Sequence, residues 1–407
     1  MVAQNWPNLY EELAARFGDH VAQARWTFCG LGACVDATLS LHDATPTLLA
    51  ASDPAARSLG ELLVHRAENG IGGEVRVRWD GGPAWLDAAL QPRTALGGAG
   101  PHSARVLSLL GAPALLALEH RDREQMAHLD GDIRLAQAGA ATAARDISPE
   151  GTPRPRIYIF EFTAGRTVRA VASPRSSRII VRFTDPQTED DANFDALSTS
   201  LAHDAGAGLL SGFNAIGHGD LDAALARARA LGSRWQAAGL ALVHMEMGGY
   251  DTPALRDRAL QGLRGVTTSL GFSQSEYRDL VPSDEPETAT IESAARRLGV
   301  NRLCIHADTW AMSATCGDPD GEREALMAGC LLASTRAALG RSAWPAAPGP
   351  AAVFEAPPDE QRSDRWNVVA CAAPYLPRPV TTLGLGDTFV AGTLLLLGRK
   401  TRNGGNT

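Results

Sequence analysis

The sequence predicts an α/β fold, in which helices cover both faces of a mostly parallel sheet. From about residue 205 onward, short apolar runs alternate with stretches whose apolar residues recur at helical spacing. This alternation is typical of repeated βαβ units. At 407 residues, the chain is also long enough for one large domain and a smaller one.

The second half of the chain supplies most of the alternation. Asp220 is expected to be the N-cap of the first helix, whose apolar stripe runs from Leu221 to Leu231. We expect strands at 208–216, 240–246, 265–271, 302–306 and 367–373, and helices at 221–231, 253–263, 291–299, 322–340 and 388–398. In sheets of this kind ligands bind beyond the carboxyl ends of the strands, which is where HME, SLGFSQSE, IHADTW and LGLGD would lie.

The first half is less regular. Residues 26–36 (WTFCGLGACVD) predict one strand that opens the core. Residues 37–96 and 151–186 contain short strands with polar alternation and little helix between them, so we expect them to form a small sheet over the ligand edge. The large domain would then comprise residues 1–36, 97–150 and 187–407. The Pro- and Ala-rich stretch 343–364 predicts an ordered loop.

Charge and cysteine content narrow the class of protein. The formal net charge is −8, which argues against a nucleic-acid partner and against an anionic membrane surface. The six cysteines form no CxxC pair and no metal-ligand spacing, so we expect buried or free thiols in a reducing compartment. The N-terminal stretch MVAQNWPNLYEEL lacks the layout of a signal peptide, and no apolar run is long enough to span a membrane. A cytoplasmic protein is the prediction.

The chain contains a single lysine, Lys400, in its polar tail. A Walker A loop, a protein kinase and a Schiff-base enzyme each need a lysine in the site. These three classes are therefore excluded unless the tail supplies the group.

The closing stretch PVTTLGLGDTFVAG (379–392) places Asp387 after two glycines and before an apolar run. One interpretation is a turn followed by a helix N-cap. The other is that the helix start around Gly384 and Gly386 presents N–H groups to an anion, while Asp387 accepts a proton from a hydroxyl. The local motif alone leaves both open.

Two acidic residues follow predicted strands. Glu246 ends the LVHME run, and Glu276 lies just past SLGFSQS. Carboxylates in such places can order a magnesium ion through water, although solvated surface glutamates are the alternative. We expect His244 to be a structural histidine.

Three further positions are candidates for contacts with a substrate. Asp36 ends a strand-like run and could bind two hydroxyls of a polyol, or could cap a helix or turn. Gly97 and Gly98 precede the helix expected at 104–111, in a loop that is either a ligand contact or a simple turn. Arg178 could reach a phosphate from the small sheet, or lie on the surface.

Taken in order, these segments resemble the ADP-dependent sugar kinases, the glucokinase and phosphofructokinase family of the ribokinase-like superfamily. The similarity spans most of the chain, and GLGDT and the His-x-Glu of His244 and Glu246 are its most specific parts. The segments that carry it are CVDATL, GGAGPHSA, IYIFEF, PRSSRII, LLSGFN, HME, SLGFSQSE, RLCIH and PVTTLGLGDT.

The resemblance implies a Rossmann-type large domain with a small β-rich lid, Mg²⁺ as cofactor and ADP as phosphoryl donor. It favours Asp387 as the base. The resemblance also implies that the amides of Gly384 and Gly386 form the anion hole, and that Asp36, Gly97 and Gly98 bind the sugar. Arg178 and the backbone of Leu385 and Gly386 would bind the nucleotide, and Glu246 and Glu276 would help to hold the metal.

Several positions depart from the family's pattern. The family usually has Asn where Cys34 stands, Asn or Gln near Ala99, and Asn at the position of Ser177. Its Asn-Glu-x-Glu stretch is here Ser273-Gln274-Ser275-Glu276, so one carboxylate survives. The phosphoryl-transfer end is better kept than the sugar end, which leaves the identity of the sugar open.

The predicted function is phosphoryl transfer, from ADP, to a hydroxyl of a sugar or sugar phosphate. The alternatives are a non-catalytic sugar- or nucleotide-binding protein of the same fold, and an ATP-dependent kinase. A phosphorylated acceptor would need cations from the lid, for which Arg76, Arg78, Arg169 and Arg175 are candidates. The sequence does not determine the oligomeric state.

Overall fold

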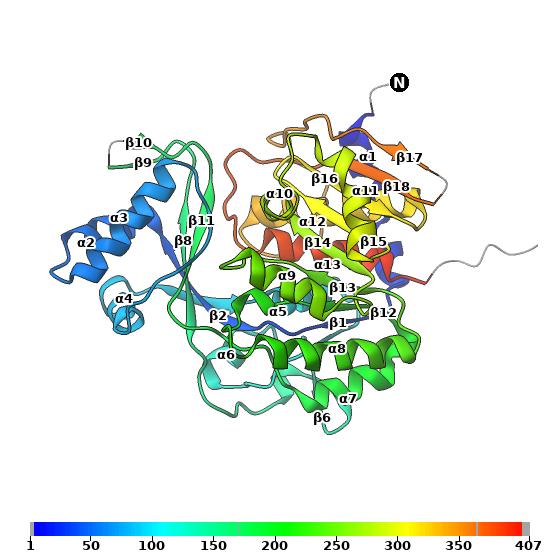
Figure 1. Cartoon of the computed structure of the whole chain (residues 1–407), viewed down its shortest axis with the longest axis horizontal. Coiled ribbons are helices and arrows are strands. Elements are labelled where there is room, and N and C mark those ends of the chain that lie inside the picture. Colours follow the sequence, from blue (N-terminus) through cyan, green and yellow to red (C-terminus); the bar gives the residue numbers. More distant parts are fainter. Residues whose placement is uncertain (1–3, 170, 364, 401–407) are drawn as a thin grey trace, which may run out of the picture.

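The computed structural model describes residues 4–169, 171–363 and 365–400. Its strands form an 11-stranded sheet, a five-stranded sheet and a two-stranded ribbon. Figure 1 shows the large sheet with its helices at the right and the five-stranded sheet with three helices at the left. The predicted α/β fold class is therefore confirmed.

The large sheet is parallel over its centre. Neighbouring strands run parallel from β15 to β6, and antiparallel pairs complete both edges. The carboxyl ends of the parallel strands therefore share one edge, where ligands bind in such sheets. In spatial order the strands are β17 (Gln361–Arg362), β18 (Asn367–Ala372), β16 (Trp310–Thr315), β15 (Arg302–His306), β14 (Ser269–Ser273), β13 (Val243–Glu246), β12 (Ala205–Leu210), β1 (Trp26–Cys29), β5 (Ala114–Leu116), β6 (Arg134–Gln137) and β7 (Ala140–Ala143).

Helices cover the large sheet on both faces, and each face has its own buried apolar core. One core includes residues of α1 (Trp6–Ala22), α5 (Ala99–Leu110), α12 (Pro319–Leu339) and α13 (Leu385–Leu397). The other includes residues of α7 (Ala192–Leu201), α8 (Leu221–Ala237), α9 (Pro253–Gly262), α10 (Gln274–Leu280) and α11 (Glu287–Leu298). The remaining helices around this sheet are α6 (Arg123–His128) and the 3₁₀ turns η1 (Ala144–Asp146), η2 (Ala202–Asp204) and η3 (Phe213–Ala215).

Helices α12 and α13 pack closely because glycines lie at their contact. A Cβ atom at Gly329 would approach the Phe389 ring to 2.6 Å, and one at Gly392 would approach the carbonyl oxygen of Ala328 to 2.9 Å. The absence of side chains there lets the two backbones meet. As a result, the start of α13 is held against a long, buried helix.

The five-stranded sheet carries helices that the sequence interpretation missed. The expectation of little helix in residues 37–96 was wrong, because α2 (Leu41–Ala50), α3 (Pro54–Glu68) and α4 (Gly82–Leu90) lie there. Leu59 and Leu63 are spaced four apart and are buried in the core of this sheet, so they form the apolar stripe of a helix. The strands in spatial order are β3 (Gly73–Arg76), β11 (Ser177–Arg182), β8 (Arg156–Phe162), β2 (Cys34–Ser40) and β4 (Arg93–Gly97), and the separate ribbon pairs β9 (Thr167–Val168) with β10 (Val171–Ala172).

Residues 26–36 were expected to form one strand, and this expectation was wrong. They form β1 in the large sheet and the start of β2 in the small sheet, separated by residues 30–33. The Gly30 N–H donates to the Leu209 carbonyl, and the Ser211 hydroxyl donates to the Gly30 carbonyl, which holds this crossing against the end of β12. β2 thus belongs wholly to the small sheet, and the division of the chain into domains at residues 36, 96, 150 and 186 stays a prediction.

Other boundaries also differ from the expectations. β12 covers only the start of the strand expected at 208–216, and η3 follows it. Gly97 ends β4 and Ala99 begins α5, so the expected glycine loop is a direct junction. The antiparallel strand β16 was not predicted. Of the loop expected at 343–364, residues 343–360 have no helix or strand, but the short strand β17 follows at Gln361–Arg362. Residue 364 of that stretch lies outside the described residues.

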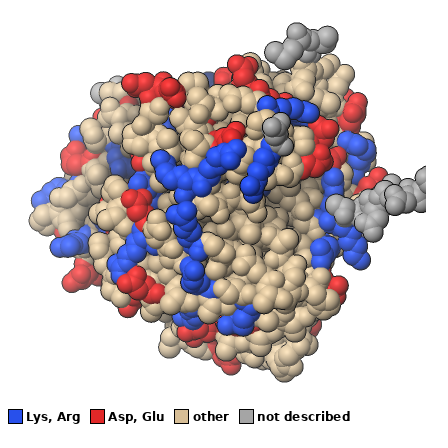
Figure 2. Space-filling view, turned by 45° about the vertical axis from the view of Figure 1, so that its right-hand side comes forward, with Lys and Arg blue, Asp and Glu red and all other residues tan. Residues whose placement is uncertain are grey.

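The cysteines are free thiols, as predicted; five are buried and Cys316 is partly buried. Among the described helices, none combines the length and apolar character needed to cross a membrane. On the face shown in Figure 2, basic and acidic side chains are both present and uncharged surface separates many of them.

Candidate active site

A cleft of about 770 Å³ lies between the two sheets. Its lining includes the last residues of three parallel strands, Glu246 of β13, Ser273 of β14 and His306 of β15, together with the start of α13. The cleft therefore lies beyond the strand ends where the ligand site was predicted. The cleft also brings together all of the predicted site residues except Gly97.

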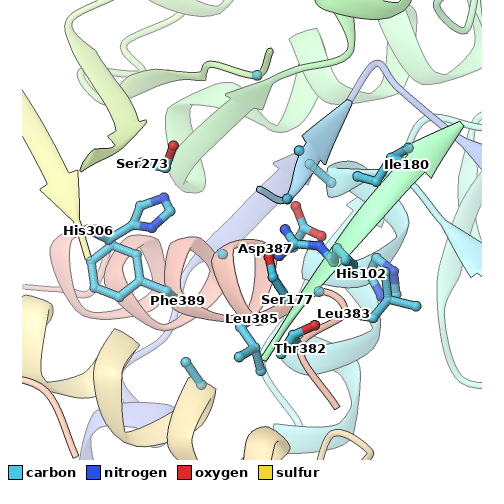
Figure 3. A pocket seen from close by; sticks show the side chains of 18 of the residues that line it. His102, Ser177, Ile180, Ser273, His306, Thr382, Leu383, Leu385, Asp387 and Phe389 are labelled. Atoms are coloured by element: carbon cyan, nitrogen blue, oxygen red, sulfur yellow. The ribbon is translucent and has the colours of Figure 1, made fainter. Parts of the chain in front are cut away.

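The start of α13 forms one wall of the cleft, where Asp387 is the third residue of the helix (Figure 3). The N-cap is Gly384, whose φ of +67° is a left-handed conformation that favours glycine. The Gly384 carbonyl accepts hydrogen bonds from the N–H and the hydroxyl of Thr388. Amides in the first turn of a helix have no partner within the helix, so they can bind an anion.

The Asp387 carboxyl has a pKa raised to about 6. Burial is the main cause, and the nearby charge of Glu246 adds to it, while Arg178, Arg336 and His306 act in the opposite direction. A carboxyl with this pKa is mostly ionised at neutral pH and is a stronger base than an ordinary aspartate.

Arg336 of α12 supports the start of α13, and the sequence interpretation did not identify it. Its Nε donates to the Leu383 carbonyl at 2.7 Å, and its Nη1 donates to the Ser342 hydroxyl at 3.0 Å. A Cβ atom at position 384 would lie 3.1 Å from this guanidinium. Gly384 is therefore suited to its place both by its backbone conformation and by the arginine beside it.

Arg178 of β11 reaches the cleft from the other sheet. Its charge lowers the pKa of both Asp36 and Asp387, so the guanidinium lies near both carboxyls. Its Nε is buried and has no hydrogen-bond partner in the structure. Arg178 and Arg336 therefore place two positive charges near the first turn of α13.

Asp36 lies in the middle of β2, not at the end of a strand as expected, and only 4% of it is exposed. Its Oδ1 accepts a hydrogen bond from the Cys34 thiol at 3.5 Å, and its Oδ2 is 3.9 Å from Nε2 of His102. Burial raises the pKa of this carboxyl to about 8. A Cβ atom at Gly97 would collide with the Asp36 carboxylate, so Gly97 makes room for Asp36 although it does not line the cleft.

Glu246 is held from two sides by histidines. Its Oε2 is 3.0 Å from Nε2 of His244, and its Oε1 is 3.2 Å from Nε2 of His306. Burial opposes ionisation of Glu246, but these two hydrogen bonds outweigh it and hold its pKa at about 2. His306, which was not singled out from the sequence, has a raised pKa because its bond to Glu246 outweighs its burial.

A chain of buried polar groups orients Glu246. His244 also contacts the Ser269 hydroxyl at 2.8 Å, and Nη1 of Arg302 donates to the same hydroxyl. Arg302 in turn donates to Glu322 of α12 at 2.8 Å. The structural role expected for His244 is consistent with these contacts, since it fixes the carboxylate that faces the cleft.

Glu276 lies in the first turn of α10 and forms a capping box with Ser273. Its Oε2 accepts the Ser273 N–H at 2.8 Å. Burial raises its pKa, and the charge of Glu246 contributes in the same direction. Within residues 4–169, 171–363 and 365–400, no group of three or more His, Cys, Asp or Glu side chains is arranged to hold a metal directly.

Glu161 of β8 joins the small sheet to the segment before α13. Its Oε1 accepts hydrogen bonds from the Thr381 hydroxyl at 2.9 Å and from the Thr382 N–H at 3.0 Å. The sequence contains no local signal for this contact, because the two segments are 220 residues apart.

The lid arginines considered from the sequence do not gather at one place. Arg76 pairs with Asp185 and Asp251, and Arg169 pairs with Glu61. Arg175, which pairs with Asp308 at 3.6 Å, lines the cleft. Arg182 also lines the cleft and is bound to Glu74 and to the Asn214 carbonyl.

Comparison with known proteins identifies the family of the chain. Residues 26–396 match the family model described as the ADP-specific phosphofructokinase/glucokinase conserved region. No curated protein matches the chain by sequence.

Three solved structures show the fold. An ADP-dependent kinase in complex with fructose-6-phosphate and ADPβS is 17% identical, with a TM-score of 0.79, 99% of this chain covered and 100% of the other. The last common ancestor of ADP-dependent phosphofructokinases from Methanosarcinales is also 17% identical, with a TM-score of 0.69 and coverages of 99% and 100%. A hypothetical ADP-dependent phosphofructokinase from Pyrococcus horikoshii OT3 is 18% identical, with a TM-score of 0.69 and coverages of 92% and 98%.

The family model spans most of the chain, and the family's members are kinases with a hydroxyl acceptor. The resemblance noted in the sequence and the prediction of a phosphotransferase are thus confirmed. The chain belongs to the ADP-specific phosphofructokinase/glucokinase family.

Proposed function

We propose that the protein transfers the β-phosphoryl group of ADP to a hydroxyl of a sugar or sugar phosphate, with Asp387 as the general base. The observation that carries this proposal is Asp387 itself, whose pKa is raised to about 6 at the glycine-capped start of a helix. An anion site and a tuned base lie side by side there, which is what in-line phosphoryl transfer requires.

In the proposed reaction, the ionised Asp387 carboxylate accepts the proton of the acceptor hydroxyl. The hydroxyl oxygen bonds to the β-phosphorus of ADP, the bond from that phosphorus to the bridging oxygen breaks, and AMP leaves. Amides of Leu385 and Gly386 in the first turn of α13 would stabilise the charge on the transferred group. Arg178 and Arg336 would add positive charge from either side.

The residues present fit a magnesium ion bound through water. Mg²⁺ in such sites usually keeps several waters and is held by one or two carboxylates and by substrate phosphates. Glu246 is kept ionised by His244 and His306, and Glu276 lies close enough for its pKa to respond to the charge of Glu246. When bound, Mg²⁺ would neutralise charge on the phosphate oxygens.

The acceptor would occupy the part of the cleft that Asp36 and other residues of the small sheet line. A phosphorylated acceptor would have to draw on Arg175, whose carboxylate partner Asp308 is 3.6 Å away, or on Arg182, which is already bound to Glu74 and Asn214. Because neither guanidinium is free of protein partners, an unphosphorylated sugar has to be tested beside sugar phosphates.

The experiment that tests this function is a transfer assay with purified protein, Mg²⁺ and a panel of sugars and sugar phosphates. ADP and ATP are compared as donors, AMP and ADP are measured as products, and a sample without acceptor is the control. We expect AMP to form in step with a phosphorylated acceptor. If ADP stabilises the protein against heat but no acceptor is phosphorylated, the proposed catalysis is wrong and the protein is a non-catalytic binder. Turnover with ATP but not ADP would overturn the donor.

Replacing Glu246 by glutamine should raise the Mg²⁺ concentration that gives half-maximal activity. The amide is uncharged, so it orders the hydrated ion less well and loses its charge-assisted bonds to His244 and His306. We expect a rise of about tenfold, the lower end for changes around metal ligands. The measurement is a magnesium titration at saturating ADP and acceptor. An unchanged midpoint would remove Glu246 from the metal role, and a Glu285→Gln variant on the surface is the control.

A further inference from the structure

His102 of α5 is a buried histidine without a partner. Only 3% of it is exposed, and neither of its ring nitrogens has a hydrogen-bond partner in the structure. It nevertheless lines the cleft, and Figure 3 shows it on the opposite side of Asp387 from His306. Buried polar side chains are nearly always hydrogen-bonded, so a pair of unpartnered ring nitrogens at a cleft points to a ligand.

The protein groups around His102 do not meet this need. Nε2 of His102 is 3.9 Å from Asp36 Oδ2, which is too far for a hydrogen bond. The Cys34 thiol already donates to Asp36, and Ala99, three residues before His102 on α5, offers only a methyl group. The adjoining wall of the cleft is apolar and consists of Ile157, Ile159, Ile180 and Leu383.

The charge state of His102 suits the recognition of a hydroxyl. Burial lowers its pKa well below the ordinary value, and the positive charges of Arg336, Arg105 and Arg178 lower it further. A neutral imidazole has one N–H donor and one acceptor nitrogen, and a hydroxyl can pair with either. Asp36 beside it presents carboxyl oxygens to the same space.

We propose that His102 binds a hydroxyl of the acceptor, and that His102 and Asp36 together recognise two hydroxyls of a polyhydroxylated substrate against the isoleucine wall. This inference rests on the proposed function, because it assigns a specificity role within the acceptor part of the same cleft. Cys34 would act indirectly, since its thiol fixes the orientation of Asp36. His102 is thus the main polar contribution of α5 to the acceptor.

The test uses His102→Leu and His102→Gln in the full chain, with the acceptor that the transfer assay identifies. We expect His102→Leu to lower kcat/KM for that acceptor by about 10- to 100-fold, the range for loss of one buried hydrogen bond. The dissociation constant for ADP should stay within about twofold, because the imidazole contacts the acceptor only. His102→Gln keeps a donor and an acceptor and should recover much of the loss. His20→Leu is the matched control, since His20 is also buried but lies outside the cleft.

Deoxy acceptors make the test specific for a hydroxyl contact. With the wild-type protein, one deoxy derivative should be a poorer substrate than the parent. With His102→Leu, the same derivative should suffer no further loss, because the contact is already missing. If His102→Leu still discriminates against every deoxy derivative as the wild type does, or if ADP affinity falls as much as acceptor affinity, the inference is overturned while the proposed function stands. If the wild type itself neither phosphorylates nor is stabilised by any acceptor, the proposed function fails and this inference fails with it.

Discussion

Replacing Asp387 by asparagine should lower kcat by about 10²- to 10⁴-fold, the usual contribution of a positioned general base. The amide has nearly the same size but does not accept the hydroxyl proton. The first-turn amides of α13 and both arginines remain in place, so ADP affinity should change little. The measurements are steady-state kinetics and an ADP binding titration on the same preparations.

The pH profile separates a base from a merely structural carboxylate. Asp387 must be ionised to act, and its pKa is raised to about 6, so kcat/KM of the wild type should rise with pH through about 6. Asp387→Asn should lose this limb. The matched control is Asp320→Asn. The Asp320 side chain is 77% exposed and lies at the start of α12, whereas Arg336 lies near the end of that helix. If Asp387→Asn retained the turnover of the wild type, the assignment of Asp387 as the base would be wrong.

Replacing Arg178 by methionine should lower kcat by about 10²- to 10³-fold, the range for removing one group that stabilises the transition state. The guanidinium lies near both Asp36 and Asp387 and would contact the transferred phosphoryl group. Because its positive charge lowers the pKa of Asp387, its removal should also move the acid limb of the pH profile to higher pH. Kinetics over a pH series measure both effects at once.

Two other substitutions show whether the effects of Arg178→Met come from the loss of its positive charge at this position. Arg178→Lys keeps the charge and should leave the acid limb near its wild-type position, although it loses the planar guanidinium. Arg175→Met removes a nearby arginine of the same segment that already pairs with Asp308, so it should leave the acid limb in place. If Arg178→Met has normal kcat and an unmoved limb, Arg178 has no part in phosphoryl transfer.

Local patterns were sufficient for many elements in the second half of the chain. The helices α8, α9, α11 and α12 and the strands β13, β15 and β18 follow from runs and stripes of apolar residues, which depend only on neighbours in the sequence. Local patterns did not predict features that depend on contacts between distant parts of the chain. Most of residues 26–36 are apolar, but the chain crosses from one sheet to the other over residues 30–33, and no local signal marks which sheet a strand joins.

Some residues of the candidate site could likewise be predicted from local patterns, and others could not. Asp387, Glu246 and Glu276 could be proposed from the sequence, because each follows a glycine turn or a strand and such positions meet at one edge of a parallel sheet. Arg336 and Glu161 could not, because Arg336 lies inside a helix and Glu161 inside a strand, and their partners are far away along the chain. His102 follows the glycines that were considered, yet only the structure shows that it is buried and unpartnered.

The α/β class, the family resemblance and the acidic residues at the strand ends could be predicted from the sequence alone. These depend on the order and spacing of residues along the chain. The folded structure was needed to show which charges surround Asp387, why its pKa rises to about 6, and that His102 faces the same cleft as Asp36. A pKa and an unmet hydrogen bond depend on distances and burial in space, and α5, β2, β11, α12 and α13 come together only when the two sheets enclose the cleft.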